Sequence, residues 1–154
     1  MRKRPHTSIS IITLGCSKNT VDSEILLRQI EANGLELSDD PNDADVVIVN
    51  TCGFIDAAKE ESVNTILEAA ERKRRGSLER LYVAGCLSER YRDELAKGIP
   101  EVDRFFGVTD FQSIIETLGG RYRRELLGER HLTTPSHFAY LKISEGCDRL
   151  CTFC

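Results

Sequence analysis

The six cysteines of this 154-residue chain fall into two groups of three. The second group, Cys147, Cys151 and Cys154, has the spacing C-x3-C-x2-C at the end of the sequence. Three sulfurs on one short loop can bind a soft metal ion or an iron-sulfur cluster. Because an odd number of crowded cysteines fits a disulfide framework poorly, we interpret this loop as a metal or cluster site.

Two other chemistries remain open for this loop. It could be a zinc knuckle that takes His131 or His137 as the fourth ligand of a tetrahedral site. Cys151 and Cys154 also have the C-x-x-C spacing of thiol-redox proteins, although a third cysteine and the lack of a thioredoxin-like context argue against that reading.

The first group, Cys16, Cys52 and Cys86, is spread along the chain, and each member follows a predicted strand and precedes a predicted helix. Parallel strands all end at the same edge of a sheet, so the three thiols should converge there. Helix N-termini arriving at this edge favour thiolates and an anionic cluster. Three buried free cysteines are the alternative, because cysteine is a common core residue.

The elements that would position these cysteines alternate between strand and helix. Strands are expected at Ser8–Leu14, Val46–Val49, Leu81–Ala84 and Arg104–Val108, with a short edge strand at Leu35–Leu37. Helices are expected to begin at Thr20 or Asp22, at Asp56, at Ser88 and at Asp110, and the second should bury Val63, Ile66, Leu67 and Ala70. This alternation predicts an α/β fold with a mostly parallel sheet flanked by helices.

We expect three segments in the chain. Residues 1–120 should form the α/β domain, and the polar residues 121–136 should be an interdomain linker. Residues 137–154 should begin a second domain with a strand at His137–Ile143 and the cluster loop behind it. A cluster loop that ends on its last ligand indicates that the second domain is truncated.

Composition limits the partners. There are 25 acidic and 21 basic side chains, for a formal net charge of −4, so we expect no direct nucleic-acid binding. No apolar run approaches the roughly 18 residues of a membrane span, and the basic start lacks the apolar segment of a signal peptide. Cysteines without a secretory signal suggest a reducing cytosol, so a cytoplasmic location is expected.

Several residues near the first three cysteines are candidates for shaping the site. Gly15, Gly53 and Gly85 would let backbone amides approach the sulfurs. Asn50 and Thr51 could donate hydrogen bonds to the cysteine that follows them. Four polar residues could also face the cluster, although helix capping explains some of them: Asn19, Asp22, Ser23 and Glu24.

With both groups of cysteines, the sequence resembles the methylthiotransferase family of radical S-adenosylmethionine enzymes. The resemblance implies that Cys16, Cys52 and Cys86 hold an auxiliary 4Fe-4S cluster. It likewise implies that Cys147, Cys151 and Cys154 hold the radical 4Fe-4S cluster, whose open iron binds S-adenosylmethionine. It covers nearly the whole chain.

Within that family, four segments are similar to the members that modify an aspartate of a small-subunit ribosomal protein: LGCSKNTVDSE, NTCGFIDAAKEES, AGCLSERYRDEL and YLKISEGCDRLCTFC. Members that act on transfer-RNA adenosine usually have Gln-Met-Asn after the first cysteine and Ser-Val-Arg after the second. Here those places read Ser17-Lys18-Asn19 and Gly53-Phe54-Ile55. The resemblance therefore favours the ribosomal substrate.

The same resemblance implies two further partners, a sulfur donor and an electron-donor protein. In the family the chain continues into a barrel that holds S-adenosylmethionine and then into a small β domain that grips the substrate. Because both lie beyond these residues, we expect the 154-residue chain to be catalytically inert by itself.

Overall fold

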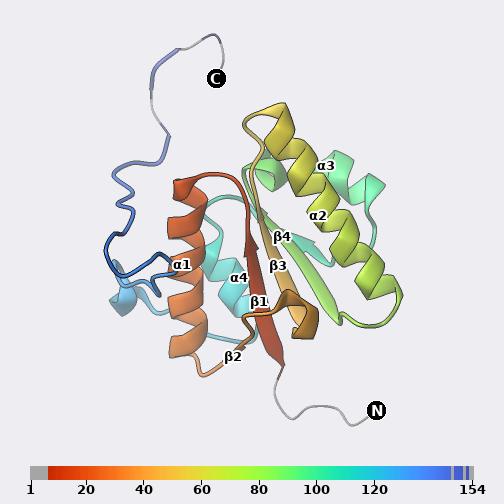
Figure 1. The fold of residues 1–154 in the computed structure, drawn as a ribbon, viewed down its shortest axis with the longest axis horizontal. Coiled ribbons are helices and arrows are strands. Elements are labelled where there is room, and N and C mark those ends of the chain that lie inside the picture. The colour runs from red at the N-terminus through yellow and green to blue at the C-terminus, as the bar shows by residue number, and fades with distance from the viewer. Residues whose placement is uncertain (1–6, 147, 151, 153–154) are drawn as a thin grey trace.

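A computed structural model describes residues 7–146, 148–150 and 152. Its centre is a five-stranded sheet with the order β2-β1-β3-β4-β5, in which every neighbouring pair is parallel (Figure 1). The strands are β1 (Ser8–Thr13), β2 (Glu36–Leu37), β3 (Val46–Thr51), β4 (Arg80–Gly85) and β5 (Arg104–Phe105). The helices are α1 (Ser17–Ala32), α2 (Asp56–Arg74), α3 (Cys86–Gly98) and α4 (Phe111–Thr117). The predicted α/β class and parallel sheet are confirmed.

Helices cover both faces of the sheet. On one face α1 and α4 bury Leu26, Ile30, Ile114 and Ile115 against Val46 and Ile48 of β3. On the other face α2 and α3 bury Ile66, Ala70, Leu87 and Leu95 against Val47 and Val49 of the same strand. Successive side chains of a strand point to opposite faces, so a central strand covered on both sides is apolar at consecutive positions.

Two helices begin earlier than the sequence predicts. α1 starts at Ser17 rather than Thr20 or Asp22, because the Thr20 amide already donates to the Cys16 carbonyl (3.2 Å) as the first helical hydrogen bond. α3 starts at Cys86 rather than after Ser88. Cys16 therefore directly precedes the first residue of α1, and Cys86 is itself the first residue of α3.

The buried stripe of α2 is rotated from the predicted one. Ile66 and Ala70 are buried as expected, but Leu67 is 42% exposed, and Ser62 and Ala69 complete the buried face. Ser62 turns inward because its hydroxyl accepts from the Cys52 amide (3.1 Å) and donates to the Cys52 carbonyl (2.9 Å). A polar anchor therefore sets the rotation of the helix, which a search for apolar periodicity does not detect.

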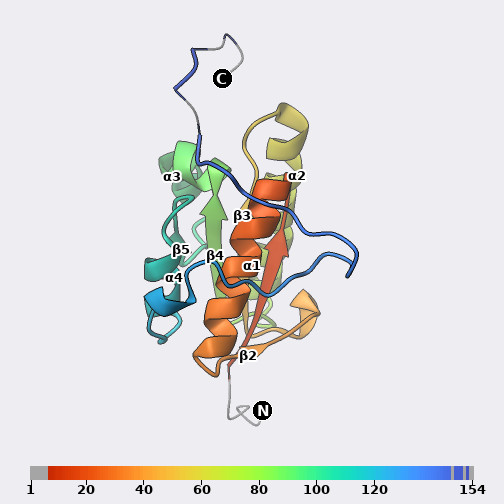
Figure 2. The ribbon, with the colours of Figure 1, turned by 90° about the vertical axis from the view of Figure 1, so that its left-hand side faces the viewer.

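Two strand predictions are also corrected. The strand expected at Arg104–Val108 is only the two residues of β5. The strand expected at His137–Ile143 does not form, and these residues are irregular. A strand needs a neighbour for its backbone hydrogen bonds, whereas this segment runs beside α1, away from the sheet (Figure 2).

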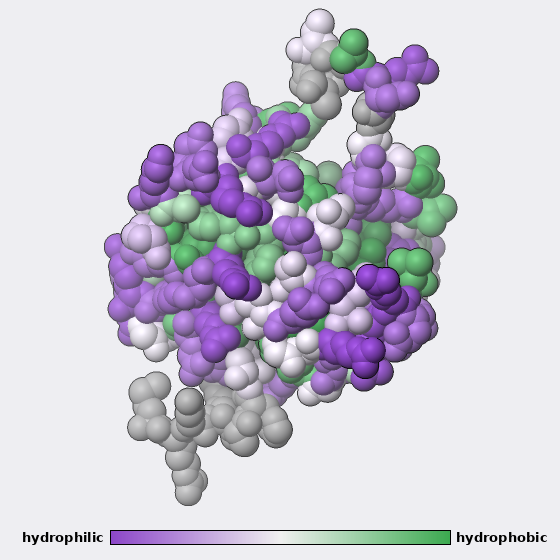
Figure 3. Space-filling view, turned by 180° about the vertical axis from the view of Figure 1, so that it is seen from behind, coloured by the Kyte–Doolittle hydropathy of each residue, from purple (hydrophilic) through white to green (hydrophobic). Residues whose placement is uncertain are grey.

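The face seen from behind is largely hydrophilic, with small apolar areas between charged side chains (Figure 3). Within the described residues, no helix is long and apolar enough to cross a membrane.

Candidate functional site

The first three cysteines follow three neighbouring strands at one edge of the sheet. Cys52 comes directly after β3 and Cys86 directly after β4, while Cys16 is three residues beyond the end of β1. Pairing of Thr13 with Asn50 and of Thr51 with Gly85 places the three strand ends side by side. The fold therefore brings Cys16, Cys52 and Cys86 to the same edge.

The three loops at this edge touch one another at glycines. A Cβ atom added to Gly15 would lie 2.7 Å from Cys52 Sγ and closer still to Cys52 Cβ. A Cβ atom added to Gly53 would lie 2.9 Å from Leu87 Cα, in the first turn of α3 beside the third cysteine. Both positions lack room for a side chain, so glycine is what allows the loops to pack this closely.

The three thiols differ in exposure: Cys16 is exposed, Cys52 is buried and Cys86 is intermediate. All three are free thiols in this structure. Burial raises the pKa of the Cys86 thiol, and the nearby Cys52 and Cys16 raise it further, against Arg90, which acts to lower it. Cys86 therefore lies close enough to both other thiols for their charges to act on it.

The donor set suits an iron-sulfur cluster. Thiolates are the usual protein ligands of such clusters, and each binds a different iron. The N-termini of α1 and α3 at Cys16 and Cys86 contribute partial positive charge that favours thiolates. A zinc ion would instead need all its sulfurs about 2.3 Å from one centre. In the described part of the chain, no group of three or more His, Cys, Asp or Glu side chains is already arranged to hold a metal ion.

Polar side chains behind the cysteines hold the loops rather than the sulfurs. The Asn19 amide donates to the carbonyls of Leu14 (2.8 Å) and Thr51 (3.0 Å). The Asn50 amide donates to the Asn19 carbonyl and to Ser23 Oγ, both at 3.1 Å. The expectation that Asn50 and Thr51 donate to a cysteine is wrong, because their donors are taken by these groups and, for Thr51, by the Ala84 carbonyl (2.6 Å).

Asp22 and Glu24 lie on α1 but point to the later part of the chain. Asp22 Oδ1 accepts from Lys142 Nζ at 2.6 Å. Burial raises the pKa of Asp22, against the hydrogen bond and charge of Lys142, which act to lower it. Glu24 is fully buried and binds Arg130 and Thr133. The expectation that Glu24 faces the cluster is therefore wrong.

Ser62 is the residue at this edge that the sequence reading missed. Its hydroxyl satisfies both the amide and the carbonyl of Cys52. The available signal was a polar residue placed four positions before Ile66, in register with the buried face of a helix.

The second group of cysteines, Cys147, Cys151 and Cys154, lies outside the described residues. Of the two histidines considered as zinc ligands, His131 has Nδ1 2.7 Å from Glu31 Oε1, and the His137 ring packs edge-on against Phe138 with centroids 5.1 Å apart. Both histidines thus contact side chains of the described region.

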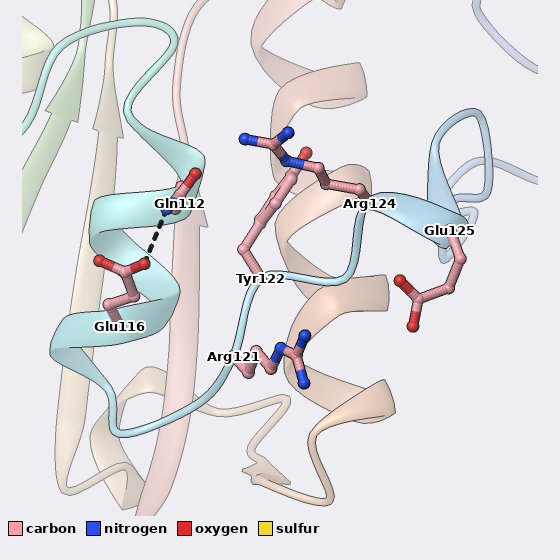
Figure 4. Close-up of a pocket in the computed structure, with 6 residues that line it drawn as sticks. All are labelled: Gln112, Glu116, Arg121, Tyr122, Arg124 and Glu125. Carbon is pink, nitrogen blue, oxygen red and sulfur yellow. Dashed lines mark hydrogen bonds between the residues drawn. The ribbon is translucent and has the colours of Figure 1, made fainter.

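A pocket of about 260 Å³ lies between α4 and the segment that follows it (Figure 4). Gln112 and Glu116 of α4 are hydrogen-bonded to each other on one side, and Arg121, Tyr122, Arg124 and Glu125 line the other. None of Cys16, Cys52 and Cys86 lines this pocket, so it is separate from the edge that these three cysteines share.

The fold and site define a class, namely an α/β domain that presents three cysteines on adjacent strand-to-helix loops. Residues 8–107 match the model described as "Uncharacterized protein family UPF0004", and the chain belongs to this family. The match falls within the domain expected at residues 1–120.

Individual proteins that are similar to this chain indicate a more specific relationship. The chain is 57% identical over 146 residues to the protein of Flavobacterium psychrophilum called ribosomal protein uS12 methylthiotransferase RimO. Proteins of the same name from Prosthecochloris aestuarii and Bacteroides thetaiotaomicron are 56% and 57% identical over 147 and 148 residues. Each match covers 95% or 96% of this chain and 34% of the relative. The resemblance to the methylthiotransferases is confirmed, and the chain spans about a third of the length of these relatives.

Proposed function

We propose that this chain is the cluster-bearing amino-terminal part of a methylthiotransferase that modifies an aspartate of ribosomal protein uS12. The observation that carries the proposal is the convergence of Cys16, Cys52 and Cys86 at one sheet edge, in a chain 57% identical to a uS12 methylthiotransferase. The similarity to uS12 methylthiotransferases favours uS12 over a transfer-RNA substrate.

In this proposal Cys16, Cys52 and Cys86 hold an auxiliary 4Fe-4S cluster, and Cys147, Cys151 and Cys154 hold a second one. When both are bound, the chemistry they supply is sulfur insertion at an unactivated carbon, with S-adenosylmethionine as cofactor and methyl source. The partners are uS12, a sulfur donor and an electron-donor protein, and the location is cytoplasmic.

This chain's own residues hold the loops of the first site in place. The packing of Gly15 on Cys52 keeps two of the loops together. Ser62 fixes the Cys52 backbone, and Asn19 ties the ends of β1 and β3. A cluster binds the thiolate form of cysteine, and the pKa of the Cys86 thiol is raised. The helix N-termini at Cys16 and Cys86 stabilise the thiolate form that binding requires.

A chimera tests this function. Residues 1–154 would replace the corresponding third of the Flavobacterium psychrophilum relative, and the product would be assayed on uS12 with S-adenosylmethionine and a reductant. We expect mass spectrometry to detect a methylthio group on one aspartate of uS12. The Cys16→Ala, Cys52→Ala, Cys86→Ala chimera should give none.

The isolated 154-residue chain is the second arm of the same test, and we expect it to leave uS12 unmodified. An inactive parent chimera that still binds both clusters would contradict the assignment of substrate. Activity that survives loss of the three cysteines would contradict the assignment of the site.

A further inference from the structure

Residues 121–142, which we call the strap, run along α1 rather than away from the domain (Figure 2). Four strap amides donate to acceptors on α1 or on Asn33, the residue that caps its C-terminal end. The Arg121 amide donates to Asn33 Oδ1 (2.7 Å), and the Arg123 amide donates to Gln29 Oε1 (2.9 Å). The His131 amide donates to the Glu24 carbonyl (3.0 Å), and the Thr133 amide donates to Glu24 Oε1 (2.8 Å). A segment predicted to be a linker is thus bonded to one helix along its course.

Glu24 is the most buried of these anchors, with no exposed surface. Its Oε2 accepts from Arg130 Nη1 at 3.1 Å, and its Oε1 accepts from the amide (2.8 Å) and hydroxyl (3.1 Å) of Thr133. A buried carboxylate is costly unless it is paired and hydrogen-bonded. Within the described residues, the groups that donate to the Glu24 carboxylate all come from the strap, so Glu24 is suited to hold this segment.

The direction of the strap gives this anchoring a consequence. The strap first contacts Asn33, at the C-terminal end of α1, and ends with Lys142 on Asp22, near the N-terminal end. Eleven helical residues span about 16 Å. The chain then leaves at the edge of the sheet where β1, β3 and β4 end, which is the edge that bears the first three cysteines (Figure 1).

We propose that Glu24 and Asp22 are positioning residues that dock the strap on α1 and thereby bring the chain leading to Cys147 to the edge that holds Cys16. The idea that this docking serves to bring two clusters together rests on the proposed function. The docking itself rests only on the contacts above. It deepens the proposed function by assigning to α1 the direction in which the chain leaves the domain.

Hydrogen exchange of the 154-residue chain tests the docking. The Glu24→Gln variant replaces the carboxylate by an amide, whose N–H donors would face the N–H donors of the Arg130 guanidinium. The Arg130→Met variant removes the guanidinium that donates to Glu24. We expect the amides of His131 and Thr133 to exchange at least tenfold faster in both variants, while amides of β3 keep their rates. The matched control is Glu31→Gln, because Glu31 contacts His131 from the exposed surface of α1 and should leave these amides within about twofold.

Two outcomes of this experiment would overturn the proposal. Equal acceleration of strap and β3 amides would show that Glu24 only supports the stability of the whole domain. Unchanged strap amides in both variants would show that Glu24 does not hold the strap.

A distance measurement tests the positioning. Spin labels on ketone-bearing residues at the exposed positions Glu60 of α2 and Ser144 beyond the strap avoid the native thiols. In the parent chain we expect a single narrow distribution of the distance between the two labels. In the variant that combines Glu24→Gln with Lys142→Met, the width of this distribution should increase at least twofold. An unchanged width would overturn the proposal. Because neither measurement needs iron, a chain that docks its strap but binds no cluster would contradict the proposed function alone.

Discussion

Gly15 lies so close to Cys52 that a Cβ atom at Gly15 would stand 2.7 Å from Cys52 Sγ. The backbone of Gly15 also has φ = +86°, a conformation that is unfavourable for residues with a Cβ atom. The loops of the first two cysteines are therefore joined by a contact that only glycine permits.

Gly15→Ala should disrupt this contact. The positive φ costs about 1–2 kcal/mol and the crowding about 1–3 kcal/mol, for a loss of about 2–5 kcal/mol in free energy of unfolding. Iron uptake on reconstitution should fall with it. The matched control is Gly34→Ala, which has φ = +68° but no neighbour within 4 Å of the new Cβ atom, and should cost only about 1–2 kcal/mol. Equal losses in urea unfolding of the two variants would refute the crowding.

Ser62→Ala should expose the role of the hydroxyl under Cys52. It leaves the buried Cys52 amide and carbonyl without that partner, at a cost of about 1–3 kcal/mol. Ser113→Ala, on the exposed surface of α4, should change stability by less than about 0.5 kcal/mol. Thermal unfolding measures both, and a Ser62→Ala chain as stable as its control would contradict the assigned hydrogen bonds.

Lys142→Met should raise the pKa of Asp22 further, because Lys142 supplies the hydrogen bond and charge that oppose the effect of burial. A carboxyl whose folded-state pKa is raised binds its proton more tightly in the folded chain. Its contribution to stability is therefore present below the unfolded pKa of 3.8 and lost as pH rises through the folded pKa.

The Lys142→Met chain should accordingly be less stable than the parent by about 1–3 kcal/mol near pH 7, and the difference should narrow toward pH 3. Carbon-13 titration of the Asp22 carboxyl and urea unfolding across this range measure the two effects. Lys97→Met, at an exposed position of α3, is the control. A stability difference that grows toward acid pH would contradict the ion pair.

The free thiols should react in the order of their exposure. Without iron, iodoacetamide should modify Cys16 first and Cys52 last, as peptide mapping would show. The rate at Cys86 should rise about tenfold per pH unit up to its raised pKa, because the thiolate is the nucleophile. Modification of Cys52 before Cys16 would be incompatible with the structure of this edge.

The sheet and the convergence of Cys16, Cys52 and Cys86 could be predicted because both follow from local patterns. Apolar runs mark buried strands, and parallel strands end at one edge whatever the details of packing. The exact start of α1 could not be predicted, since Thr20 and Asp22 are good capping residues by type, and the carbonyl of Cys16 rather than a side-chain cap begins the helix.

The strap shows the limit of sequence reading more clearly. Residues 121–136 are polar, and polar composition predicts an exposed linker. Their ordered path depends on buried polar side chains of α1, such as Gln29 and Glu24, whose partners are about a hundred residues away in sequence. Periodicity reports which faces are apolar, but it does not report which polar groups are paired across such a distance.

The central claim is that Cys16, Cys52 and Cys86 together hold an iron-sulfur cluster. The most direct measurement is iron, sulfide and zinc per chain after anaerobic reconstitution, beside the Cys16→Ala, Cys52→Ala, Cys86→Ala variant. We predict about four irons and the broad visible absorption of a 4Fe-4S centre, lost in the variant. Zinc without iron, or iron binding that is indifferent to these three cysteines, would contradict the claim and make this a structural metal domain.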